Sequence, residues 1–142
     1  MKAIRLLFAA TALAATAALA HADDRIYVAY LYGGQERPVL GDLDAYGTAT
    51  VTINAANTGI CYSIILHNTV ASTAAHIHSG PPQVAGVVAL ALPVNASIPL
   101  RVANCVGAPA ALIGSLRAGS QNFYVNVHNA AFPGGAARGQ LE

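Results

Sequence analysis

The feature that most constrains the fold is the alternation of apolar and polar side chains in short runs. In the run Tyr46–Ile53, three threonines alternate with Ala, Val and Ile. Successive side chains of a strand point to opposite faces, so this pattern predicts a strand with one buried face. Gly, Pro, Asn and Asp interrupt such runs every eight to twelve positions. The sequence therefore predicts an all-β domain, a sandwich or a barrel.

The pattern extends over one domain, residues 23–142, without an internal repeat or a linker. A short helix is expected at 109–117, before Gly119. We expect strands at 26–32, 46–53, 60–67, 74–78, 86–92, 98–102, 123–128 and 137–141.

The first 22 residues have the three parts of a secretory signal peptide. Lys2 and Arg5 precede an apolar run of 15 residues, 6–20, and the run ends at the small-x-small site Ala20-His21-Ala22. A run of this length is shorter than the roughly 20 residues needed to span a bilayer. We therefore expect residues 1–22 to be removed and the domain to be periplasmic or secreted.

Charge limits the partners of the domain. Residues 23–142 contain five Arg, six acidic residues and no Lys. A near-neutral surface without a basic cluster does not supply the phosphate neutralisation that nucleic acids require, nor a polybasic patch for anionic lipid. No second apolar run approaches spanning length, so we expect neither a nucleic-acid partner nor a membrane span after cleavage.

Two cysteines, Cys61 and Cys105, are the only ones in the chain. In an exported chain a pair of cysteines without CxxC spacing favours a disulfide, here closing a loop of about 45 residues. A free-thiol or metal-thiolate role is the less favoured alternative.

The histidines lie on the polar side of the predicted alternation. His76 and His78 are two residues apart, so their rings project side by side from a strand while Ile77 points inward. His128 is on the polar face of its own strand. Two imidazoles from one strand and a third from another form a set that suits copper or zinc.

The fourth position of such a site is open to His67, Tyr124 or water. The alternative is that these histidines are surface residues or anchor loops through hydrogen bonds. His-x-His by itself is a weak motif.

Several strings of this sequence resemble one family. They are Gly34-Gln35-Glu36-Arg37-Pro38-Val39, Thr73-Ala74-Ala75-His76-Ile77-His78-Ser79-Gly80, Phe123-Tyr124-Val125-Asn126-Val127-His128-Asn129, and Arg138-Gly139-Gln140-Leu141. In this order they are similar to the CHRD domain, a module first described in chordin and also found alone in exported bacterial proteins. The resemblance implies an antiparallel Greek-key sandwich of immunoglobulin-like or superoxide-dismutase-like architecture.

The resemblance also marks Glu36, Asn126 and Arg138 as motif positions. The family usually has an acidic residue after the last Gly pair, where this chain has Ala136. Arg138 must then find another partner, and Glu36 is the candidate. We expect a structural role for this pair, because a solitary carboxylate does not perform paired acid and base work.

These observations favour a binding module over an enzyme. The sequence contains no G-x-S-x-G elbow, P-loop or Rossmann fingerprint, and we assign no catalytic residue. The preferred hypothesis is an exported module that binds copper or zinc. One alternative is a metal-free structural or adhesion domain with an extracellular or periplasmic protein partner. Another is a copper-dependent redox enzyme of dismutase-like architecture, which rests on fold analogy.

Overall fold

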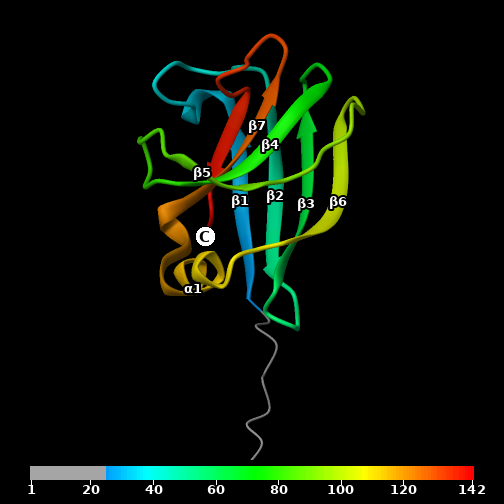
Figure 1. Ribbon diagram of the computed structural model, residues 1–142. Coiled ribbons are helices and arrows are strands. Elements are labelled where there is room, and N and C mark those ends of the chain that lie inside the picture. Colours follow the sequence, from blue (N-terminus) through cyan, green and yellow to red (C-terminus); the bar gives the residue numbers. More distant parts are fainter. Residues whose placement is uncertain (1–24) are drawn as a thin grey trace, which may run out of the picture.

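The computed structural model describes residues 25–142 (Figure 1). The predicted signal peptide, residues 1–22, lies outside this part of the chain, so its cleavage site stays a prediction. Within the described part, no helix has the length and apolarity to cross a membrane. The elements are β1 (Ile26–Tyr32), η1 (Gly33–Gln35), β2 (Tyr46–Ile53), β3 (Gly59–His67), β4 (Ser72–Ser79), β5 (Val87–Ala91), β6 (Leu100–Gly107), α1 (Ala110–Gly119), η2 (Ser120–Asn122), β7 (Phe123–Asn129) and β8 (Ala137–Gln140).

The eight strands form one sheet in the order β5-β4-β7-β8-β1-β2-β3-β6. Every pairing is antiparallel. The sheet curls so that β4 and β5 cross β1 and β2, with α1 at one end (Figure 1). The all-β prediction with a single short helix is confirmed. The finer assignment to an immunoglobulin-like or dismutase-like Greek key stays a prediction.

Most strand boundaries agree with the alternation pattern, and β6 differs most. It begins at Leu100 and continues to Gly107, whereas the sequence predicted 98–102. Pro99 lacks a backbone N–H and is a poor strand residue, and pairing with β3 extends from Leu66–Leu100 to Gly59–Gly107. Its side chains are mostly exposed at this edge of the sheet, so it lacks the alternation that predicts a strand.

The inner face of the curled sheet holds the hydrophobic core. On β3 the four residues Ile60, Tyr62, Ile64 and Leu66 are all buried, as the alternation predicted. Leu112, Ile113 and Leu116 of α1 complete this core at one end. Burial of these side chains is the main source of the stability of the fold.

The outer face of the sheet is partly covered. The strand β3 alternates between buried and half-buried residues, but β7 is buried on both faces. Tyr124 and Asn126 lie on this outer face of β7, and both are buried. The cause of their burial is that loops 33–45 and 80–86 contact this face through Glu36 and Val84.

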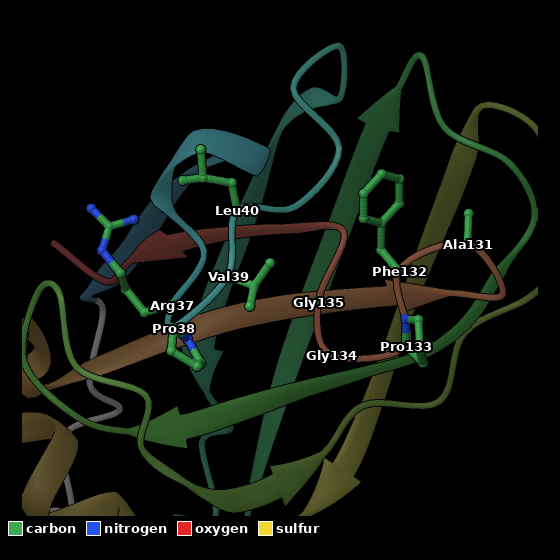
Figure 2. A pocket seen from close by; sticks show the side chains of 9 residues that line it. All are labelled: Arg37, Pro38, Val39, Leu40, Ala131, Phe132, Pro133, Gly134 and Gly135. Carbon is green, nitrogen blue, oxygen red and sulfur yellow. The ribbon is translucent and has the colours of Figure 1, made fainter.

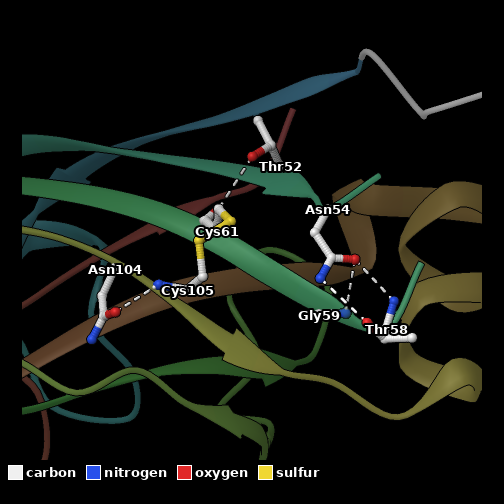
Figure 3. Close-up of a disulfide and its surroundings, with 7 residues drawn as sticks. All are labelled: Thr52, Asn54, Thr58, Gly59, Cys61, Asn104 and Cys105. Carbon is white, nitrogen blue, oxygen red and sulfur yellow. Dashed lines mark hydrogen bonds between the residues drawn. A yellow bond between two sulfur atoms is a disulfide. The ribbon is translucent and has the colours of Figure 1, made fainter. Parts of the chain in front are cut away.

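A disulfide joins Cys61 of β3 to Cys105 of β6 (Figure 3). The two residues are directly opposite in the strand register, with their Cα atoms 4.0 Å apart. It therefore ties the edge strand β6 to the sheet, and the predicted pairing is confirmed.

Replacing both Cys61 and Cys105 by Ala should lower the free energy of unfolding by about 4 kcal/mol, because the bond restricts the unfolded chain. Urea unfolding of the variant and of oxidised wild-type protein measures the difference. Wild-type protein in reducing buffer should unfold like the variant. A loss below about 1 kcal/mol would contradict this account of the bond.

Candidate metal centre

The register between β4 and β7 brings three histidines together. His128 is opposite Ala74, and His76 is opposite Asn126, so His128 lies diagonally across from His76. His78 is two residues further along the same face of β4. Diagonal neighbours of an antiparallel pair are within reach of long side chains. His76, His78 and His128, the histidine cluster, are therefore brought together by strand pairing.

Distances within the histidine cluster are short. His76 Nδ1 lies 3.0 Å from His128 Nε2, and one ring nitrogen of each histidine lies within 4.8 Å of the other two. The ring centroids of His76 and His78 are 5.5 Å apart, and those of His76 and His128 are 4.9 Å apart. The ring of His78 is buried, whereas His76 and His128 are half-buried and give the cluster access to solvent.

Backbone carbonyls orient two of the three rings. His78 Nδ1–H donates to the carbonyl of Gly86 at 2.9 Å, and His128 Nδ1–H donates to the carbonyl of Pro133 at 3.1 Å. A carbonyl only accepts, so these bonds place the proton of each neutral ring on Nδ1 and leave a lone pair on Nε2. The Nε2 atom of His78 is buried and has no hydrogen-bond partner in the protein. A buried polar atom of this kind requires an explanation.

The surroundings favour neutral imidazoles. Burial is the main cause that lowers the pKa of each of the three histidines. Positive charge on His128 and His78 would lower the pKa of His76 further, and Arg138 does the same for His78. The three pKa values lie below the ordinary 6.5, so the rings are largely neutral at neutral pH. The lone pair of His128 Nε2 accepts a hydrogen bond from His76 Nδ1–H at 3.0 Å, whereas His78 Nε2 has no partner in the protein.

Tyr124 packs beside the cluster. Its ring is stacked on that of His78, with centroids 4.8 Å apart and planes 10° from parallel. The guanidinium of Arg138 lies 3.4 Å from the Tyr124 ring centroid. Because β4 and β8 flank β7, the Tyr124 ring lies between His78 of β4 and Arg138 of β8. Its hydroxyl accepts a hydrogen bond from the N–H of Gly86 at 3.0 Å.

Glu36 is buried over the same face. Its Oε2 accepts a hydrogen bond from Asn126 Nδ2 at 3.1 Å, whereas Oε1 meets no protein donor. Arg138 acts on Glu36 through its charge, but it donates its hydrogen bonds to Val84 and Gln140. Glu36 and Arg138 therefore interact through their charges, without a direct hydrogen bond. Burial raises the pKa of Glu36 to about 7, and the charge of Arg138 opposes this rise.

His67 is not brought to the cluster. It lies on β3, which three strands separate from β7, and its ring is stacked on that of Tyr46 with centroids 5.2 Å apart. The sequence did not distinguish His67 from the other histidines, because all of them fall on the polar side of a strand. The structure therefore removes His67 as the fourth ligand of this cluster.

A cavity of about 420 Å³ lies between two loop segments. Figure 2 shows residues 37–40 on one side of it and residues 131–135 on the other. Pro133 belongs to this lining and also supplies the carbonyl that orients His128.

Residues 27–141 match the profile of the CHRD domain. The chain belongs to the CHRD domain family. The match covers nearly all of the described chain and confirms the family resemblance of the motifs. No curated protein and no solved structure matches the chain.

Two groups in this CHRD domain escaped prediction from the sequence. The carbonyls of Gly86 and Pro133 orient two of the imidazoles, and residue type gives no indication of where a backbone carbonyl will lie.

Gly135 could have been found from the sequence, because it is part of a Gly pair. Its φ is +145°, and a Cβ there would lie 2.5 Å from the Glu36 carboxyl carbon. Glycine is therefore needed where this loop closes over Glu36.

Replacing Glu36 by Gln should change how the stability of this CHRD domain depends on pH. Between pH 4.5 and about 7 the folded chain keeps a proton on Glu36 that the unfolded chain has released. The unfolding free energy of the wild type thus loses a contribution as pH rises through this window, and E36Q should not lose it. Relative to wild type, E36Q should gain on the order of 2 kcal/mol between pH 5 and pH 8.

Urea unfolding at both pH values measures this difference, and the histidines cancel because both proteins contain them. E142Q, which changes the exposed terminal Glu142, is the control and should follow the wild type. An unchanged difference between E36Q and wild type at the two pH values would refute a raised pKa.

Proposed function

We propose that this CHRD domain binds one transition-metal ion, copper or zinc, through His76, His78 and His128. The observation that carries the proposal is the convergence of three neutral imidazoles, two of which are oriented by backbone carbonyls. A metal-binding histidine commonly donates its other ring N–H to a carbonyl or carboxylate. His78 and His128 already make this bond.

The nitrogen separations support the same proposal. Two nitrogens that bind one metal at about 2.0–2.1 Å with tetrahedral angles lie about 3.3 Å apart. His76 Nδ1 and His128 Nε2 are 3.0 Å apart and share a hydrogen bond, and a metal that binds both nitrogens would take the place of the proton between them. The farthest pair of ligand atoms is within 4.8 Å, so a small inward movement of His78 completes the set. Metal binding would give the buried Nε2 of His78 the partner that the protein does not provide.

An all-nitrogen donor set favours copper or zinc over calcium or magnesium, which prefer oxygen. The hydroxyl of Tyr124 is already bonded to Gly86, and His67 lies elsewhere. We therefore assign the fourth position to water or to a ligand from solution. An open position of this kind suits metal storage, sensing or delivery.

We infer that the domain acts outside the cytoplasm, in the periplasm or the extracellular space. The disulfide between Cys61 and Cys105 supports this location, because such bonds persist in oxidising compartments.

The alternative function is a metal-free structural or adhesion module. The hydrogen bonds from His78 and His128 to loop carbonyls favour it, since they also anchor residues 80–86 and 131–135. The redox-enzyme alternative rests on fold analogy alone, and we do not propose it.

Metal analysis tests the site. Protein purified from the periplasm without chelator or affinity tag should retain about one equivalent of metal after incubation with copper or zinc and desalting. H76A and H128A should each lose most of it, because two imidazoles hold the ion far less tightly than three. Mass spectrometry measures the number of metal equivalents bound per protein molecule.

H67A is the matched control, since His67 is also half-buried beside an aromatic ring. It should keep the metal. Circular dichroism must show that each variant is folded. Retention by H76A and H128A, or no retention by the wild type, would favour the metal-free module.

Metal retention should fall with pH below the ordinary imidazole range. Protons compete with the metal for the ring nitrogens, and burial lowers the pKa of all three histidines. The midpoint of metal release should therefore lie below pH 6.5. Dialysis at a series of pH values followed by metal analysis measures it. Release that begins above this value would contradict ligation by these rings.

A further inference from the structure

The outer face of β1, β2 and β3 presents a group of aromatic rings that the histidine cluster does not use. Tyr32, Tyr46 and His67 are neighbours in one row of the strand register. Tyr30, Thr48 and Ile65 form the next row. These six residues, with Gly47, line a surface hollow of about 420 Å³. We call them the tyrosine platform.

The rings of the tyrosine platform are open to solvent. Tyr30 is 55% exposed, Tyr32 47% and Tyr46 48%. Loops 33–45 and 80–86 contact the outer face over β7 and β8, whereas the platform stays exposed. Large exposed apolar groups that gather on one face commonly mark a binding surface.

The platform is also partly rigid. The ring of His67 is stacked on that of Tyr46, with planes 16° from parallel. All six side chains come from paired strands, so the backbone beneath them is fixed. A site built on strands and held in place before binding has less conformational entropy to lose.

The chemistry of the lining indicates an uncharged ligand. The seven lining residues include no Lys, Arg, Asp or Glu. A nucleic acid or an anionic lipid would need cations to neutralise its phosphates. Phenol rings offer apolar faces, and the hydroxyls of the tyrosines and Thr48 donate and accept hydrogen bonds. A sugar ring has the complementary character, with C–H groups on its faces and hydroxyls on its rim.

The size of the hollow is compatible with a small ligand. Its volume of about 420 Å³ is within the usual range of small-molecule sites, about 300–1,000 Å³. We propose that the tyrosine platform binds a neutral oligosaccharide, with sugar rings packed against Tyr30, Tyr32 and Tyr46.

Titration calorimetry with three neutral hexasaccharides tests the proposal, using β-1,4-linked glucose, β-1,4-linked N-acetylglucosamine and α-1,4-linked glucose. Wild-type protein should bind at least one of them saturably. Y30A and Y32A should each weaken that binding about tenfold or more, because each removes a stacking surface. Y32F keeps the ring and should lose less. Exposed positions tolerate such changes, so the variants should fold.

V87A is the control, since Val87 is 75% exposed on β5, away from the platform. It should bind like the wild type. All platform variants should keep their metal, which separates this proposal from the metal site.

Absence of binding to all three sugars, or unchanged binding by Y30A and Y32A, would overturn the proposal. Sedimentation velocity tests whether a second copy of this chain occupies the platform instead. A concentration-dependent dimer of the wild type that Y32A abolishes would identify the platform as a contact between two copies and would also overturn it.

Discussion

The pairing of β4 with β7 is the contact on which the histidine cluster depends. Its register sets His76 opposite Asn126 and His78 opposite Tyr124, with His128 one diagonal step away. A shift of this register by one residue would turn the imidazoles of one strand to the core face. Ile77, Val125 and Val127 prevent the shift, because they are fully buried on the other side of the same two strands. The same strand register therefore fixes both the packing of the core and the positions of the three imidazoles.

A second constraint is that the outer face of β4, β7 and β8 is covered by loops. The loops and the sheet face beneath them contain polar groups, and each buried polar group needs a hydrogen-bond partner. Asn126 bonds to Glu36, Arg138 bonds to Val84, and His78 and His128 bond to loop carbonyls. Three buried atoms without a hydrogen-bond partner in the protein, Glu36 Oε1, His78 Nε2 and Asn126 Oδ1, lie in this layer. The candidate metal site therefore lies in the part of the sheet that combines polar side chains with burial.

Prediction from the sequence worked best where a pattern reflects local geometry. The strand containing Tyr46–Ile53 was predicted at its observed boundaries, because threonines and apolar residues alternate along it. His76 and His78 were predicted as neighbours from their spacing alone, and the pairing of Cys61 with Cys105 from their number. The pattern did not indicate that Tyr124 is buried or that His67 lies away from the other three histidines. Both depend on which distant segment covers or faces a strand, and alternation records only which side of its own strand a residue occupies.

The sequence by itself determined that this chain forms an all-β domain whose strands have two opposite faces, and that its imidazoles lie on the polar one. The physical reason is the two-residue period of a strand, which sorts side chains without reference to the rest of the molecule. The tertiary structure decided which histidines meet, which carbonyls orient them, and which tyrosines stay open to solvent. These outcomes depend on strand order and loop placement, which bring together residues as distant in sequence as Glu36 and Asn126.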